Sequence, residues 1–147
     1  MTRVILTRGV KEYRATILKY VDKSDTVLEI GSGWGTTTGL LYRAAGKVVG
    51  IDKGESYHTA AKTYPWIEFY QIDGFDVSQV LSLGYRFNKV YIDISGCRDI
   101  YDVIKIILRY QGAIRPEIII VKSTKLKGFV DNCQVWNAGL NKDLIVR

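Results

Sequence analysis

Acidic side chains recur in this chain where predicted β-strands end. Glu29 precedes a glycine turn, Gly31-Ser32-Gly33-Trp34-Gly35, and Asp52, Asp73 and Asp93 each close a short apolar run. Glycines in a turn leave room for the edge of a bulky ligand, because no Cβ intrudes. A carboxylate at a strand end can accept hydrogen bonds from ribose hydroxyls. These residue types predict a site for a ligand that contains a nucleoside.

The spacing of the glycines argues against a dinucleotide. Dinucleotide turns follow the pattern G-x-G-x-x-G, and here Thr36 occupies the position of the third glycine. Glu29 would repel a pyrophosphate, whereas it suits a ligand with a cationic amine. Asp52 lies about 20 residues beyond the turn, as a ribose-binding acid does. A nicotinamide-dependent oxidoreductase is therefore disfavoured.

The sequence patterns of strands and helices alternate along the chain, and these elements are expected to hold the glycine turn and the acids in place. They predict an α/β fold in a single domain over residues 1–147, with a doubly wound, mostly parallel sheet and helices on both faces. Ligands in such sheets bind at the carboxyl ends of the strands. Strands are expected to begin at Thr26 and to span Val48–Asp52, Trp66–Ile72, Asn88–Ile94 and Glu117–Val121. Helices are expected over about 9–22, Ser56–Thr63, Phe75–Leu83 and Leu126–Trp136, and two more should begin at Thr36 and at Ile100.

The order of these motifs resembles the class I, Rossmann-like, S-adenosylmethionine (SAM) methyltransferases, whose first motif reads E/D-x-G-x-G-x-G. The resemblance covers about residues 10–125. Members usually end in a further strand and an antiparallel hairpin, but here only Leu144–Val146 is a strand candidate, so the C-terminal strands are expected to be shortened. The resemblance implies SAM as cofactor, S-adenosylhomocysteine as product and cofactor-binding roles for Glu29, Gly31, Ser32, Gly33, Trp34, Gly35, Asp52, Lys53, Asp73, Gly74 and Asp93.

Three residues are candidates for the methyl-transfer step: Asp93, Lys122 at the end of the fifth expected strand, and Lys11 on the leading helix. They look like part of the K-D-K-E set of fibrillarin-like and heat-shock RNA 2′-O-methyltransferases, in which the strand-five lysine is the proposed proton acceptor. The glutamate of that set has no counterpart here. The acceptor therefore stays open, with an RNA 2′-hydroxyl as one candidate. The alternative is a SAM-binding subunit or sensor without catalytic activity.

Composition and charge limit the partners, the location and the metal sites that can be expected. The net charge is +6, with the basic excess near both ends, which makes RNA a candidate partner. No apolar stretch is long enough to span a bilayer and no signal-peptide pattern is present, so a cytoplasmic protein without membrane contact is expected. The single histidine, His58, and the two cysteines, Cys97 and Cys133, lack metal-ligand spacing, and no metal is expected.

Overall fold

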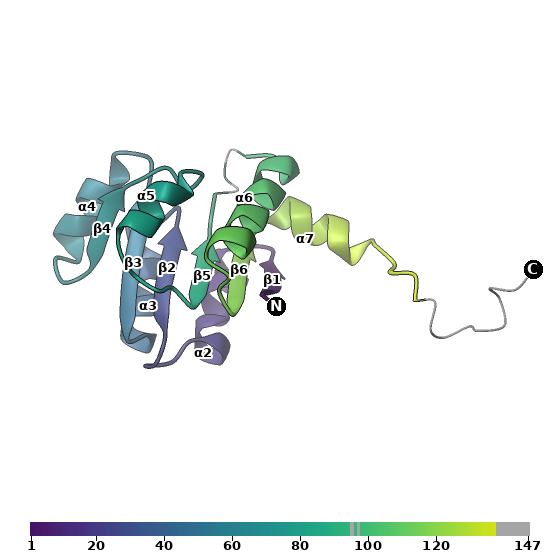
Figure 1. The fold of residues 1–147 in the computed structure, drawn as a ribbon, viewed down its shortest axis with the longest axis horizontal. Helices are drawn as coiled ribbons and strands as arrows, with labels where there is room; N and C mark the ends of the chain where they lie inside the picture. The colour runs from purple at the N-terminus through teal and green to yellow at the C-terminus, as the bar shows by residue number, and fades with distance from the viewer. Residues whose placement is uncertain (95, 97, 138–147) are drawn as a thin grey trace, which may run out of the picture.

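The structure is a computed structural model that describes residues 1–94, 96 and 98–137. Its strands form one six-stranded sheet in the order β1-β6-β5-β2-β3-β4, and every pair is parallel (Figure 1). The strands are β1 (Arg3–Thr7), β2 (Thr26–Ile30), β3 (Lys47–Asp52), β4 (Glu68–Gln71), β5 (Lys89–Ile92) and β6 (Ile118–Lys122). The helices are α1 (Val10–Ala15), α2 (Ile17–Tyr20), α3 (Thr36–Ala44), α4 (Ser56–Thr63), α5 (Val77–Ser82), α6 (Ile100–Ala113) and α7 (Thr124–Asp131).

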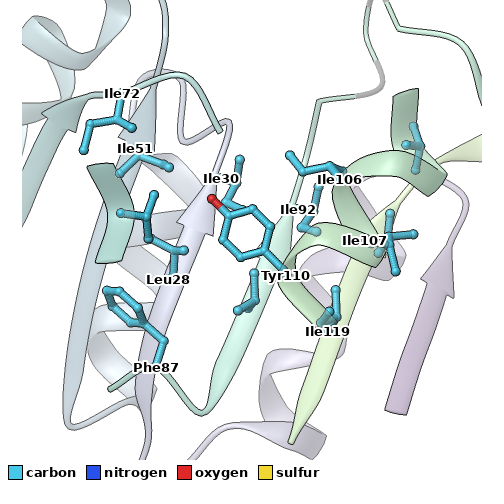
Figure 2. Packing of buried hydrophobic residues seen from close by; sticks show 14 of the residues in the cluster. Leu28, Ile30, Ile51, Ile72, Phe87, Ile92, Ile106, Ile107, Tyr110 and Ile119 are labelled. Atoms are coloured by element: carbon cyan, nitrogen blue, oxygen red, sulfur yellow. The ribbon is translucent and has the colours of Figure 1, made fainter. Parts of the chain in front are cut away.

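Apolar side chains cover both faces of the sheet. Successive strand residues point to opposite faces, so Val27 and Leu28 enter different core clusters. One cluster packs under α5, α6 and α7, with Ile106 and Tyr110 of α6 close to β2 and β5 (Figure 2). The other packs under α1, α2 and α3. The predicted doubly wound arrangement, with helices on both faces, is confirmed.

The beginning of the chain differs from the prediction. Residues Arg3–Thr7 form β1, which the sequence analysis missed, and β1 pairs with β6 at the edge of the sheet. The predicted continuous helix over 9–22 is instead two short helices that meet at Thr16. The Thr16 hydroxyl donates to the carbonyl of Tyr13 at 2.6 Å and lies 3.0 Å from the hydroxyl of Tyr91. Side-chain bonds of this kind compete with regular helix bonding.

The end of the described chain also differs. The last helix stops at Asp131, because the Asn132 and Cys133 amides already bond back to Phe129 and Val130. It therefore does not reach Trp136 as predicted. The strand candidate Leu144–Val146 lies outside the described residues. Within the described residues no strand follows β6, and no helix is long and apolar enough to cross a membrane.

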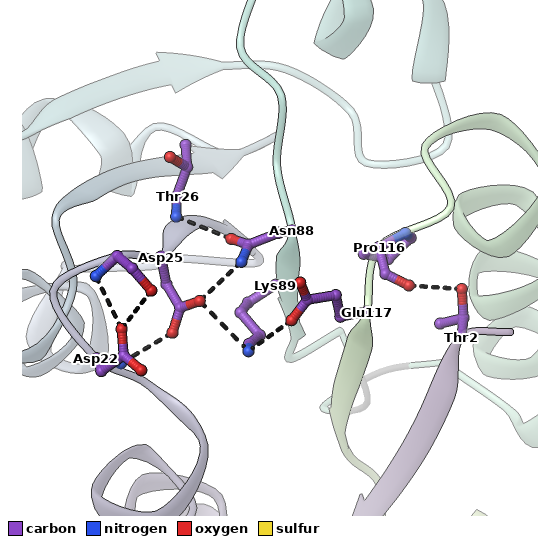
Figure 3. A network of polar contacts seen from close by, with 9 residues as sticks. Thr2, Asp22, Asp25, Thr26, Asn88, Lys89, Pro116 and Glu117 are labelled. Carbon is purple, nitrogen blue, oxygen red and sulfur yellow. Dashed lines mark hydrogen bonds and ion pairs between the residues drawn. The ribbon is translucent and has the colours of Figure 1, made fainter.

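A polar network holds the amino ends of the central strands in register (Figure 3). The ammonium of Lys89, which begins β5, lies 3.3 Å from Asp25 and 3.1 Å from Glu117, the residues before β2 and β6. Asn88 donates to Asp25 at 2.7 Å and accepts from the Thr26 amide at 2.9 Å. This network lies at the strand edge opposite the carboxyl ends, so it fixes the strands without occupying the predicted site.

Candidate functional site

A cleft of about 310 Å³ opens at the carboxyl ends of the strands. That volume lies within the range of small-molecule sites. Residues from or just after β2, β3, β4, β5 and β6 contribute to its wall, so chain segments far apart in the sequence meet there. Its lining consists of Ile30, Gly31, Asp52, Lys53, Ile72, Asp73, Gly74, Phe75, Asp93, Ile94, Gly96, Arg98, Ile106 and Lys122.

The glycine turn lies directly after β2. Gly31, Gly33 and Gly35 all have positive φ angles, of 80°, 53° and 85°. A Cβ on Gly31 would overlap the carbonyl of Asp93, so this glycine allows the end of β2 to pass beside the end of β5. A Cβ on Gly33 would meet nothing within 4 Å. Gly31 is therefore required for the close approach of β2 to β5, while the position of a Gly33 side chain would be open.

Two side chains of the predicted turn do not line the cleft. The Trp34 side chain is exposed, and Ser32 is buried, with a hydroxyl that has no hydrogen-bond partner among the described residues. Gly33 and Gly35 also lie outside the lining. The turn therefore borders the cleft through Gly31 and its backbone, and cofactor contacts from Ser32, Gly33, Trp34 and Gly35 remain predictions.

Asp52 joins the turn to the end of β3. Its carboxylate accepts from the amide of Gly33 at 2.9 Å and from the amide of Gly54 at 2.8 Å. These bonds fix the carboxylate at the wall of the cleft, next to Lys53. A fixed carboxylate with remaining acceptor capacity is what two vicinal ribose hydroxyls require.

Asp73 and Gly74 form the wall after β4. The Asp73 carboxylate accepts from the Phe75 amide at 2.9 Å, and the hydroxyl of Tyr110 on α6 donates to the Gly74 carbonyl at 2.8 Å. The Tyr110 bond ties this loop to α6. The loop thus contributes the Asp73 carboxylate, the backbone of Gly74 and the Phe75 ring to the wall of the cleft.

Asp93 and Lys122 meet at the other end of the lining. The Lys122 ammonium donates to Asp93 at 2.8 Å, and both side chains are 24% exposed. The structure therefore brings together two of the three predicted catalytic residues. Lys11 is exposed on α1 and is not part of the cleft lining, so its predicted role is not supported by contact with the other two.

Glu29 lies behind the turn rather than in the cleft lining. Its side chain is fully buried and accepts from the Thr38 hydroxyl on α3 at 2.5 Å. Burial raises the pKa of Glu29 to about 8, and the nearby charge of Asp93 adds to the rise, whereas the Thr38 bond and Arg14 oppose it. The neighbouring Tyr13 hydroxyl is also buried. Its pKa is raised well above the ordinary value by burial and by the charge of Glu29. The predicted contact of Glu29 with the cofactor stays untested.

Seven lining residues were not predicted as site residues: the isoleucines Ile30, Ile72, Ile94 and Ile106, together with Gly96, Phe75 and Arg98. Phe75 directly follows the Asp73-Gly74 pair, so its position in the chain was a usable signal. Arg98 lies just before α6 and lines the cleft, and no residue pattern in the sequence indicates this position. Among the described residues, no group of three or more His, Cys, Asp or Glu side chains could hold a metal ion.

No protein-family model and no curated protein matches this sequence. Solved structures do. An rRNA methylase from Streptococcus thermophilus matches with a TM-score of 0.60 and 13% identity, over 87% of this chain and 81% of that one. A Streptococcus mutans protein in complex with SAH, described as a methyltransferase, matches with a TM-score of 0.63 and 12% identity, over 87% and 84%.

A dimethyladenosine transferase from Plasmodium falciparum also matches, with a TM-score of 0.59 and 21% identity, over 79% of this chain. The chain spans only 42% of that protein's length. At these identities the likeness establishes the architecture and not the activity. Together with the strand order, it shows that the described part of the chain has the Rossmann-like α/β fold of these methyltransferases.

Proposed function

We propose that this protein binds SAM in the cleft at the strand carboxyl ends and transfers its methyl group to an acceptor. One observation carries the proposal: Gly31, Asp52, Asp73 and Asp93, which are far apart in the sequence, line a single cleft together with Lys122. The fold is one in which several structural neighbours are methyltransferases by name. Those names support the proposal but describe other proteins.

The residues present fit SAM. Asp52 would hold the ribose hydroxyls, and Asp73 with Gly74 would border the adenine, next to the Phe75 ring. The open space at Gly33 accommodates a ligand that a side chain would obstruct. When bound, SAM supplies a methyl group that is already activated by a sulfonium centre. The protein then has to orient the acceptor and manage its proton.

For the acceptor we propose RNA, with a 2′-hydroxyl as the leading atom. Asp93 and Lys122 lie where the acceptor would enter, and Lys11 and Lys125 on the first turns of α1 and α7 are exposed cations that can meet phosphates. A lysine that takes the hydroxyl proton must first be neutral. The Lys122 ammonium donates to Asp93, so acceptor binding would have to rearrange this pair before Lys122 could act as a base.

Cofactor binding is tested with Asp52→Asn. The amide has one acceptor oxygen where the carboxylate has two, so it cannot keep the Gly33 and Gly54 contacts on separate oxygens and also accept from two ribose hydroxyls. SAM affinity should therefore fall by about 1.5–3 kcal/mol. Isothermal titration calorimetry with SAM and with NAD measures the change, and NAD should not bind. Asp22→Asn, an exposed acid outside the cleft, is the matched control. Unchanged SAM affinity in a folded Asp52→Asn variant would contradict the proposed site.

Transfer is tested with tritiated SAM against total RNA and protein extracts. Lys122→Ala should reduce labelling of RNA far more than it reduces RNA binding, whereas Lys125→Ala on the adjacent α7 should change mainly binding. An acceptor nucleotide with a 2′-deoxyribose should not be labelled. Labelling of the deoxy substrate would move the acceptor to a base atom. Tight SAM binding without labelling of any extract would favour the binding-subunit alternative.

A further inference from the structure

The outer face of α6 carries apolar and basic side chains that do not pack on the sheet. Val103, Ile106, Ile107 and Tyr110 point into the core, whereas Tyr101 and Leu108 are 70% and 59% exposed. The outer side chains form a groove of about 370 Å³. Its lining, called here the α6 groove, consists of Tyr101, Ile104, Lys105, Leu108 and Arg109.

The α6 groove adjoins the cofactor cleft through one aromatic ring. Phe75 lines the cleft, and its ring centroid lies 5.8 Å from the Lys105 ammonium and 5.6 Å from the Arg109 guanidinium, which both line the groove. Arg98 of the cleft lies 5.2 Å from the same centroid. Three cations therefore surround Phe75, and a ligand that leaves the cleft on this side meets the groove.

The charge of the groove is not balanced. Arg98 pairs with Asp102 at 3.2 Å. In the described part of the chain neither Lys105 nor Arg109 forms an ion pair with an acid, and Arg109 donates instead to the carbonyl of Phe75 at 2.6 Å. Lys105 also lies 6.0 Å from the ring of Tyr101. An anionic occupant would supply the missing charge.

An exposed aromatic ring beside unpaired cations suits single-stranded nucleic acid, in which bases stack on aromatic side chains while cations contact the phosphates. A protein partner fits less well, because lysine is depleted at protein interfaces and Lys105 lines the groove. A duplex also fits less well, because its bases are stacked on one another and cannot reach Tyr101.

We infer that the α6 groove binds a single-stranded segment of the RNA acceptor, next to the nucleotide that enters the cleft. A base stacks on Tyr101, and phosphates contact Lys105 and Arg109. This inference rests on the proposed function, since it assigns the RNA class and a second contact surface to the same site. It predicts that affinity for RNA depends on residues that touch neither SAM nor the methyl acceptor.

The test compares two double variants of the full chain. Tyr101→Ala/Lys105→Ala removes the stacking ring and one free cation from the groove. Tyr42→Ala/Lys62→Ala removes the same residue types from exposed positions on α3 and α4, away from α6. Fluorescence anisotropy of a labelled single-stranded oligoribonucleotide reports RNA affinity, and calorimetry reports SAM affinity.

The groove variant should bind the oligoribonucleotide about tenfold or more weakly than the unaltered protein, and the control variant within twofold of it. The groove variant should also show a smaller dependence of affinity on salt, and duplex RNA should compete poorly. SAM affinity should be unchanged in both variants.

Each contrary result has its own meaning. Equal RNA affinity of the two variants overturns the groove inference and leaves the proposed function standing. Normal SAM binding without any RNA binding by the unaltered protein overturns both the groove inference and RNA as the acceptor. Absence of SAM binding by the unaltered protein overturns the proposed function itself.

Discussion

Replacement of Glu29 by Gln tests the electrostatics behind the glycine turn. The change removes a titratable group but keeps its shape and an oxygen that can accept from the Thr38 hydroxyl. In the folded protein burial raises the pKa of Glu29 to about 8, and the nearby charge of Asp93 adds to the rise. In an unfolded chain the pKa returns to the ordinary value of 4.5. Glu29→Gln, in contrast, has no charge to gain at any pH.

Proton linkage gives the direction and the size of the effect of Glu29 on stability. Between these two pKa values the folded protein holds a proton that the unfolded chain has released, so stability falls as pH rises. The stabilising contribution is fully present below about pH 4.5 and is lost by about pH 8. Within this window the free energy of unfolding falls by about 1.4 kcal/mol for each pH unit. The total loss is of the order of 5 kcal/mol. We therefore expect Glu29→Gln to gain stability over the unaltered protein as pH rises.

Urea denaturation followed by circular dichroism at pH 5, 6.5 and 8 measures this difference. Several other carboxyls also titrate, and the pKa values of Asp22, Asp76 and Asp131 are lowered by their hydrogen bonds. Subtraction of the two stability curves cancels those groups. Glu55→Gln is the surface control: its side chain is 85% exposed and its contact with His58, at 3.5 Å, is at the surface, where an ion pair contributes little, so its stability difference should stay much smaller than that of Glu29→Gln. A difference for Glu29→Gln that does not change with pH would refute the argument.

Two further predictions concern the framework of the site. Gly31→Ala should destabilise the protein strongly, because its Cβ would overlap the Asp93 carbonyl. Gly33→Ala should lower stability by only about 1–2 kcal/mol, through left-handed backbone strain, and should act mainly on SAM affinity. Urea denaturation measures the first effect and calorimetry the second, and equal destabilisation by the two variants would contradict the different roles of Gly31 and Gly33. Lys89→Met should lower stability by about 3–5 kcal/mol, because the 3% exposed Asp25 would lose its charged partner, and an unchanged urea midpoint would count against this.

Local patterns in the chain were sufficient for the main architecture. The run from Thr26 to Asp52 alternates strand, glycine turn, helix and strand over a short distance, and those elements form where predicted, with β3 beginning one residue earlier. The acids Asp52, Asp73 and Asp93 could be assigned to one site because the carboxyl ends of parallel strands share an edge. Periodicity and chain order carry this information, and both can be read without knowing any contact.

Long-range pairing decided what the sequence left open. Val4, Ile5 and Leu6 form a short continuous apolar run without polar alternation, and periodicity alone cannot assign such a run to a strand. The segment becomes β1 because it pairs with β6, with Arg3 opposite Ile118. The position of Glu29 in β2 directs its side chain to Thr38, behind the turn. Arg98 reaches the cleft, and Lys122 reaches Asp93, through the folding of distant segments. Side-chain direction and loop path depend on packing against residues remote in the chain, so only the tertiary structure could settle them.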